Sequence, residues 1–151
     1  MAHIDYTDFH QSAPAAVAAL MALGHAVGES GLEKDLVELV KLRVSQINGC
    51  AFCVQYHLNL ARKLSVSAAR LDLLVAWRDV PVFSARERMA LAWAEALTGM
   101  AGRPVDEALR EQLATVFSTE EIVFLTAAVG GINAWNRIAG GLAFTPPSAA
   151  A

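Results

Sequence analysis

The sequence predicts an all-α protein, and three observations point to that class. Apolar residues recur at intervals of three or four through most of the chain, which is the pattern of a helix with one buried face. Ser84 and Ser118 are each followed three residues later by glutamate, the capping box that opens a helix. No segment shows the alternation of apolar and polar residues that a half-buried strand needs. We therefore expect about seven helices and no sheet.

Turn and cap residues set the expected ends of these helices. Asn48 and Gly49 form a turn between two helices, with Asn48 as the cap of the second. The last helix is expected to stop at Gly140 and Gly141, because helices often end at glycine. The expected helices cover about 13–28, 32–46, 50–64, 65–77, 84–99, 105–116 and 119–139.

The chain has 151 residues, which is the length of one domain. We expect an N-terminal arm over residues 1–12, a helical domain over 13–142 and a frayed tail over 143–151. Hydrophobic residues make up 55% of the chain and charged residues only 18%, which is more apolar surface than a small monomer readily hides. This excess predicts a homo-oligomer with apolar contact surfaces.

Charge and hydropathy exclude several kinds of partner. The net charge is −3 and no basic block is present, so we expect no nucleic-acid partner. No apolar run reaches the roughly 18 residues of a membrane span, and no secretory signal is visible. We therefore expect a cytoplasmic protein without a membrane partner. In that compartment a cysteine pair is more often redox-active or metal-binding than part of a structural disulfide.

The residues that carry chemistry gather around one turn of the chain. Cys50, Cys53 and His57 share one helical face, because residues three, four and seven positions apart lie on the same side of a helix. If the two helices that meet at the turn fold back as an antiparallel hairpin, Glu38 reaches the same height as His57. A carboxylate, an imidazole and a thiol in this order form a path along which a proton can move.

Two cysteines three residues apart suit a two-electron redox cycle. A thiolate that attacks a peroxide becomes a sulfenic acid, which the second cysteine captures as a disulfide. The positive end of a helix favours a thiolate at Cys50, whereas the Glu38 and His57 pair favours one at Cys53. The residues alone do not choose between the two cysteines. Asn133 and Asn136, which flank Trp135 in the last helix, could hydrogen-bond near the site, but we interpret them as helix-surface amides.

The spacing of these residues resembles the core motif of the AhpD-like alkylhydroperoxidases of the carboxymuconolactone decarboxylase superfamily. The motif is a glutamate, eleven residues, Cys-x-x-Cys, three residues and a histidine, followed by Ala-Arg. It corresponds here to Glu38, Cys50, Cys53, His57 and Ala61-Arg62, and the likeness extends to residues 36–43, 47–53, 87–97 and 132–137 and covers about 5–142.

The resemblance implies an all-α fold with the motif on a helix-turn-helix hairpin, assembled as a trimer or a hexamer. It implies peroxidase and disulfide reductase activity, with Cys53 as the attacking thiol, Cys50 as the resolving thiol, and Glu38 and His57 as the proton relay. The reductant would be a dihydrolipoamide or thioredoxin-like dithiol, and no cofactor is implied. The characterised enzyme of the AhpD type carries a second histidine just before its second cysteine. Phe52 stands there, which predicts weak peroxidase activity or another proton path.

Three alternatives compete with the peroxidase interpretation. Two cysteines, one histidine and one glutamate could complete a tetrahedral zinc site. A carboxymuconolactone decarboxylase-like lyase would use the same scaffold, although that reaction does not call for a cysteine pair. A non-catalytic redox sensor would react once with an oxidant and stop. Sustained turnover of a hydroperoxide separates an enzyme from a sensor.

Overall fold

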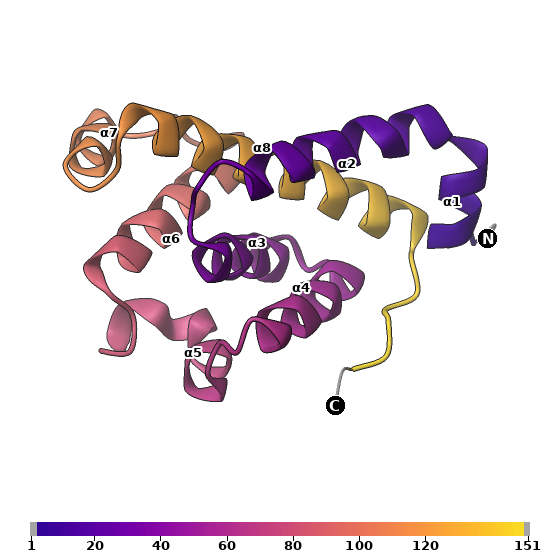
Figure 1. Cartoon of the computed structure of the whole chain (residues 1–151), viewed down its shortest axis with the longest axis horizontal. Helices are drawn as coiled ribbons and strands as arrows, with labels where there is room; N and C mark the ends of the chain where they lie inside the picture. The colour runs from indigo at the N-terminus through magenta and orange to yellow at the C-terminus, as the bar shows by residue number, and fades with distance from the viewer. Residues whose placement is uncertain (1–2, 150–151) are drawn as a thin grey trace.

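The computed structural model describes residues 3–149, and this part of the chain is helical with no strand (Figure 1). The predicted all-α class is therefore confirmed. Residues 1–2 of the expected arm and 150–151 of the expected tail lie outside the described residues. The described elements are α1 (Tyr6–Ser12), α2 (Pro14–Gly28), α3 (Lys34–Asn48), α4 (Ala51–Lys63), α5 (Ala68–Asp72), the 3-10 helix η1 (Leu74–Asp79), α6 (Ala85–Thr98), α7 (Glu107–Ala114) and α8 (Thr119–Leu142).

Side-chain caps begin several helices where the sequence predicts them. Ser84 and Ser118 each accept a hydrogen bond from the backbone N–H of the glutamate three residues later, and each glutamate bonds back to the cap. Ser67 caps α5 in the same way through its hydroxyl. Each cap satisfies a backbone donor that the first turn of a helix leaves without a partner. The predicted starts of α6 and α8 are confirmed.

The single helix expected over 65–77 is wrong, because the chain forms the short helix α5 and then the 3-10 helix η1. Leu71, Leu74 and Trp77 are all buried in one small core. Leu71 lies in α5 and Leu74 and Trp77 lie in η1, where the backbone leaves helical φ/ψ angles at Ala76. The winding therefore changes within this segment while all three side chains stay in the same core.

Two further differences concern the ends of the chain. The expected arm contains the helix α1, which Asp5 caps and which carries Tyr6 and Phe9 on its inner side. The predicted stop of the last helix at the glycine pair is wrong, because α8 continues to Leu142. The backbone N–H of Phe144 donates to the carbonyl of Ala139, and the Phe144 side chain is buried. This apolar anchor beyond the helix end fixes the terminus.

Helix α3 lies at the centre of the fold and packs against α4, α6 and α8 (Figure 1). It contributes to both hydrophobic cores: Val40 and Val44 belong to the larger core, and Leu39 and Leu42 to the smaller one. Because α3 is covered on several sides, the polar residues it carries inward are held by dense packing. The predicted hairpin of α3 and α4 is present.

Helix α8 is long and apolar enough to cross a membrane, the one such helix among residues 3–149. In this fold it packs against α2, α3, α4 and α6. Its inward side chains include Leu125, Val129 and Ile132, which belong to the larger core. These contacts are those of a core helix.

Candidate active site

The corner between α3 and α4 brings the two cysteines together. Gly49 ends α3 with a φ of 66°, a conformation that glycine adopts without the steric cost of a Cβ. Cys50 then becomes the N-cap of α4, and its Sγ accepts a hydrogen bond of 3.2 Å from the backbone N–H of Cys53. The expected cap, Asn48, is therefore wrong. A sulfur takes the capping position, so both cysteines sit at the start of one helix.

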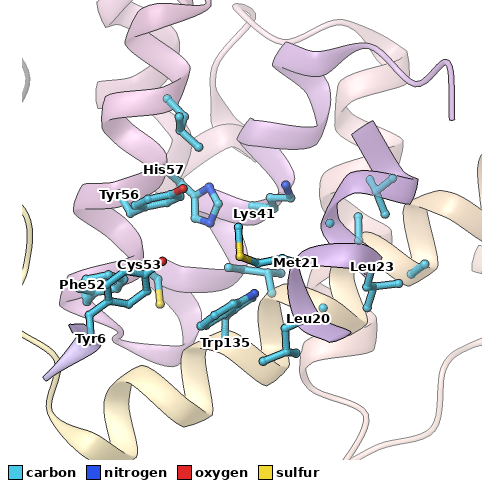
Figure 2. Close-up of a pocket in the computed structure, with 17 residues that line it drawn as sticks. Tyr6, Leu20, Met21, Leu23, Lys41, Phe52, Cys53, Tyr56, His57 and Trp135 are labelled. Atoms are coloured by element: carbon cyan, nitrogen blue, oxygen red, sulfur yellow. The ribbon is translucent and has the colours of Figure 1, made fainter. Parts of the chain in front are cut away.

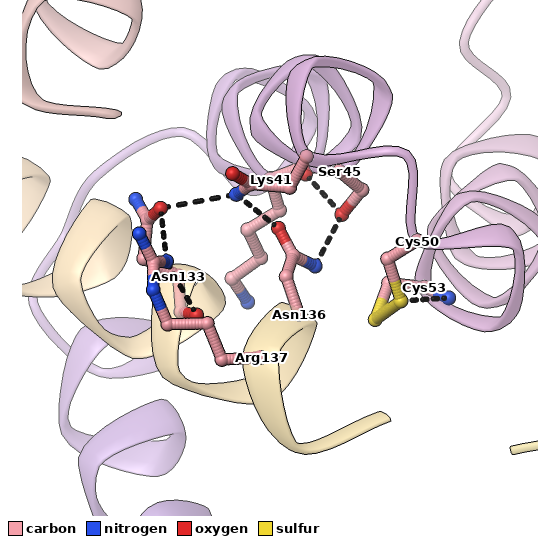
Figure 3. Close-up of a disulfide and its surroundings, with 8 residues drawn as sticks. Lys41, Ser45, Cys50, Cys53, Asn133, Asn136 and Arg137 are labelled. Carbon is pink, nitrogen blue, oxygen red and sulfur yellow. Dashed lines mark hydrogen bonds between the residues drawn. A yellow bond between two sulfur atoms is a disulfide. The ribbon is translucent and has the colours of Figure 1, made fainter. Parts of the chain in front are cut away.

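Cys50 and Cys53 form a disulfide, with their Cα atoms 5.3 Å apart (Figure 3). Both side chains are buried. A separation of this size lies within the range over which two cysteines form a bond without moving the backbone. The pair can therefore alternate between a disulfide and two thiols on one fixed turn of helix.

Glu38 on α3 faces His57 on α4 across the hairpin, as the spacing predicts. Nδ1 of His57 lies 2.7 Å from Oε2 of Glu38, and both side chains are buried. A carboxylate only accepts hydrogen bonds, so Nδ1 carries the hydrogen and Nε2 of the neutral ring is left to accept a proton. Nζ of Lys41 donates to Oε1 of the same carboxylate at 3.4 Å.

The charge state of Glu38 follows from these partners. Burial raises the pKa of the Glu38 carboxyl, but the hydrogen bond with His57 and the charge of its protonated ring, followed by the charge and hydrogen bond of Lys41, outweigh it. The net result is a pKa below the ordinary value of 4.5. At neutral pH Glu38 is thus a buried carboxylate that holds the imidazole in one orientation.

Cys53 and His57 open on a cavity of about 210 Å³ (Figure 2). Its walls come from five helices, and Cys50 is not among the residues that line it. Most of the lining side chains are apolar or aromatic, so the cavity suits an apolar molecule. The walls are formed by Tyr6 of α1, Leu20, Met21, Leu23, Gly24 and Val27 of α2, Lys41 of α3, Phe52, Cys53, Tyr56, His57 and Leu60 of α4, and Ala127, Ala128, Gly131, Ile132 and Trp135 of α8.

Phe52 stands between two tyrosine rings rather than in a hydrogen-bonded chain. Its ring stacks on Tyr6 at 5.4 Å and on Tyr56 at 6.1 Å between centroids. Burial, followed by the nearby Tyr56, raises the pKa of Tyr6 above its ordinary value, so its hydroxyl stays protonated at neutral pH. A phenyl ring carries no exchangeable proton, so no proton path runs through Phe52.

A network of amides ties the corner to α8 (Figure 3). The side-chain amide of Asn48 donates to Asn133 at 3.0 Å and to Asn136 at 2.9 Å. The amide of Asn136 in turn donates to the hydroxyl of Ser45 at 3.0 Å. Asn136 is buried, so the interpretation of this residue as a surface amide is wrong. Its hydrogen-bond partners lie on another helix, which the sequence does not show.

The donor set of a zinc site is not assembled in the described residues. Across residues 3–149, no group of three or more histidine, cysteine, aspartate or glutamate side chains is arranged to hold a metal ion. The two sulfur atoms bond to each other, and Nδ1 of His57 is bonded to Glu38. This arrangement favours thiol chemistry over the zinc alternative.

Several residues of the cavity were not predicted from the sequence. Tyr6 and Met21 come from helices that carry no part of the motif. Lys41 lies on the helix that carries Glu38, and it was not predicted as part of the site either. Its position three residues after Glu38, on the same helical face, is the signal that could have identified it.

Comparison with known proteins agrees with this architecture. The model of the carboxymuconolactone decarboxylase family matches residues 14–96. The chain belongs to this family. It is 32% identical to the uncharacterized protein YdfG of Bacillus subtilis over 130 residues, which cover 86% of this chain and 88% of YdfG.

Two solved structures extend the comparison to the fold. ATU0492 of Agrobacterium tumefaciens, a protein of unknown function proposed to be the antioxidant defence protein AhpD, is 40% identical. The match covers 97% of this chain and 99% of the ATU0492 chain, with a TM-score of 0.91. The debrominase Bmp8 covers 91% of this chain and 74% of its own, with a TM-score of 0.81 and 18% identity, and so shows the fold alone. Both solved structures therefore share this fold, and ATU0492 is the one of the two that is similar enough in sequence to bear on more than the fold.

Proposed function

We propose that this protein is a thiol-dependent peroxidase and disulfide reductase of the AhpD type. One observation carries the proposal: Cys53 opens on an apolar cavity beside an imidazole that a buried carboxylate orients, and a second cysteine lies within bonding range. A substrate in the cavity would meet the thiol, the proton acceptor and the apolar walls at once. The likeness to ATU0492 supports an antioxidant role at the level of the family.

The reaction begins with both cysteines reduced. His57 accepts the proton of Cys53, and the resulting thiolate attacks the outer oxygen of the hydroperoxide. The O–O bond breaks, the leaving alkoxide takes a proton to become an alcohol, and Cys53 becomes a sulfenic acid. Cys50 then attacks that sulfur, water leaves, and the disulfide forms. A dithiol reductant returns two electrons and two protons to complete the cycle.

The division of labour between the cysteines rests on their surroundings. Cys53 lines the cavity, whereas Cys50 does not, so a substrate would reach Cys53 first. Cys50 caps α4 and lies within bonding range of Cys53, so it can attack the sulfenic acid that forms there. Glu38 keeps the imidazole in the tautomer that accepts the proton of Cys53.

The proposal includes the setting of the reaction. The reductant would be a dihydrolipoamide or thioredoxin-like dithiol, and the site of action the cytoplasm. We also propose that the protein forms a trimer or a hexamer. Helix α2 supports self-association because most of its residues are apolar and exposed in the single chain, including Met21 at 57% exposure.

Steady-state turnover is the deciding experiment. Reduced protein is mixed with cumene hydroperoxide and an excess of dithiothreitol, and loss of the peroxide is followed over many equivalents. We expect repeated turnover. Consumption of only one equivalent per chain would identify a sensor and exclude the enzyme.

Three variants test the roles of the cysteines. Cys53→Ser should abolish peroxide consumption, whereas Cys50→Ser should still react once and leave a sulfenic acid that dimedone traps. Ala51→Ser, which adds a hydroxyl to the same helical turn at an exposed position, serves as the control and should keep wild-type turnover. Equal loss of every reactivity in both cysteine variants would contradict the division of labour.

A further inference from the structure

The cavity beside Cys53 holds an uneven distribution of charge. Among the described residues that line it, Lys41 is the one with a permanent charge. His57, the hydroxyls of Tyr6 and Tyr56 and the indole N–H of Trp135 are the other polar side-chain groups, and the remaining lining is apolar or sulfur. No carboxylate lines the cavity within the described residues. A molecule in this space therefore meets apolar walls and one positive charge.

The ammonium of Lys41 is only partly neutralised. It lies 3.4 Å from Oε1 of Glu38, which is long for a charge-assisted hydrogen bond, whereas His57 lies 2.7 Å from Oε2. An ammonium has three N–H donors, and this one uses a single donor on Glu38. The Lys41 side chain is 20% exposed, so its charge acts in partly dry surroundings. An anion from a ligand could take the unused donors.

The position of Lys41 relative to Cys53 constrains the ligand. His57 lies four residues after Cys53, which is about 6 Å along the axis of α4. Lys41 and His57 are bonded to the two oxygens of one carboxylate, so the ammonium lies near the height of the imidazole (Figure 2). A group bound by Lys41 is thus several ångströms from the sulfur that attacks the peroxide. The peroxide and the anionic group must therefore lie at opposite ends of a short ligand.

The volume of the cavity limits the size of the ligand. An engineered cavity of about 150 Å³ lined by apolar side chains binds benzene. The cavity here, at about 210 Å³, has room for one substituted ring or a branched chain of similar size. Trp135, Tyr56 and Met21 supply the faces that would pack against it.

We propose that Lys41 is a specificity residue, and that the substrate is a compact apolar hydroperoxide carrying a carboxylate at the end away from the peroxide. Lys41 binds the carboxylate while the peroxide meets Cys53. This inference rests on the proposed peroxidase function for its chemistry, but the anion site itself can be measured without turnover.

Binding of non-reactive probes tests the anion site. The affinity of the oxidised protein for 4-isopropylbenzoate and for its neutral analogue 4-isopropylbenzamide is measured by calorimetry. The wild type should prefer the carboxylate by about tenfold, the size expected for one hydrogen bond to a charged group. Lys41→Met should lose this preference and Lys41→Arg should keep most of it. Lys34→Met, an exposed lysine on the same helix and outside the cavity, should leave it unchanged.

Turnover of matched peroxides then separates the two proposals. Cumene hydroperoxide with a para carboxylate is compared with the para carboxamide, using dithiothreitol as reductant. In Lys41→Met the ratio of kcat/KM for the carboxylate to kcat/KM for the carboxamide should fall about tenfold, whatever the variant does to the reaction common to both peroxides. Equal affinity of the wild type for both probes, or an equal fall of kcat for both peroxides in Lys41→Met, would overturn the inference. A carboxylate preference in binding without turnover of any peroxide would uphold the anion site and refute the peroxidase.

Discussion

Helices α2 and α3 are of equal length, fifteen residues each, yet they are covered very differently. In α3 eight residues are buried, whereas in α2 only Val17 and Val27 are. The sequence of α3 contains five charged residues and that of α2 contains none, so the helix with more charge is the more deeply buried. Composition alone would place them the other way round.

The reason is that charged side chains of α3 pair with other side chains inside the fold. Glu38 bonds to His57, and Arg43 bonds to Glu95 at 2.7 Å. Its apolar residues fill both cores. Helix α2 packs mainly on α8, where Leu23 comes close to Gly131, and leaves an apolar side uncovered. The α3 wall of the cavity is therefore held by packing within the chain, whereas most of α2, on the opposite wall, is exposed.

The largest effect is expected in the centre of α3. Leu39 is fully buried, so Leu39→Ala should lower the free energy of unfolding by about 3 kcal/mol through lost transfer energy and a cavity. Met21→Ala on α2 should cost less than about 1 kcal/mol, because the side chain is more than half exposed. Urea titration measures both. Equal losses of unfolding free energy in the two variants would mean that the side chain on α2 is as well packed as the one on α3.

The contact of α3 with α8 depends on the buried amide of Asn136. Asn136→Ala should lower the free energy of unfolding by about 2 kcal/mol, because it removes hydrogen bonds to Ser45 and Asn48 from a buried position. Asn133→Ala, in the same network but half-buried, is the matched control and should cost less than about 1 kcal/mol. A smaller effect at Asn136 than at Asn133 in urea titration would show that the network does not hold α3 in place.

A smaller, pH-dependent effect is expected at Glu38. Its pKa is lower in the folded protein than the ordinary 4.5, so the stability it contributes is complete above that value and is lost as the pH falls through the lower folded pKa. Glu38→Gln should therefore cost about 1 kcal/mol at pH 7, and the difference from wild type should shrink in acid. Thermal unfolding between pH 3 and 7 measures it. The exposed Glu111→Gln is the control, and its difference from wild type should not change with pH. If Glu38→Gln also gave a constant difference, the charge of the Glu38 carboxylate would not contribute to stability.

The smallest effect on folding and the clearest effect on assembly are expected at the uncovered side of α2. Ala22 is exposed there, so Ala22→Glu should change the free energy of unfolding by less than about 0.5 kcal/mol. It should nevertheless shift the protein towards the monomer, because a charge would enter an apolar contact. Light scattering after size-exclusion chromatography measures the mass. Ala108→Glu on α7 is the control, and an unchanged mass for both variants would remove α2 from the interface.

Local pattern in the sequence determined much of this protein. The capping boxes at Ser84 and Ser118, the turn at Gly49 and the spacing of Cys50, Cys53 and His57 all act within a few residues, so they can be read without knowing the fold. The all-α class follows from the same short-range periodicity. The pairing of Glu38 with His57 could also be anticipated, because one tight turn connects their helices.

Only the tertiary structure decided the features that depend on contacts between distant segments. The winding of η1, the end of α8 at Leu142, which Phe144 anchors, and the burial of Asn136 each depend on contacts with other helices. The cavity is built from five helices, so neither its apolar walls nor the place of Lys41 in it follows from any one segment. Local sequence specifies hydrogen bonds within a turn, whereas burial is a property of the whole packed chain.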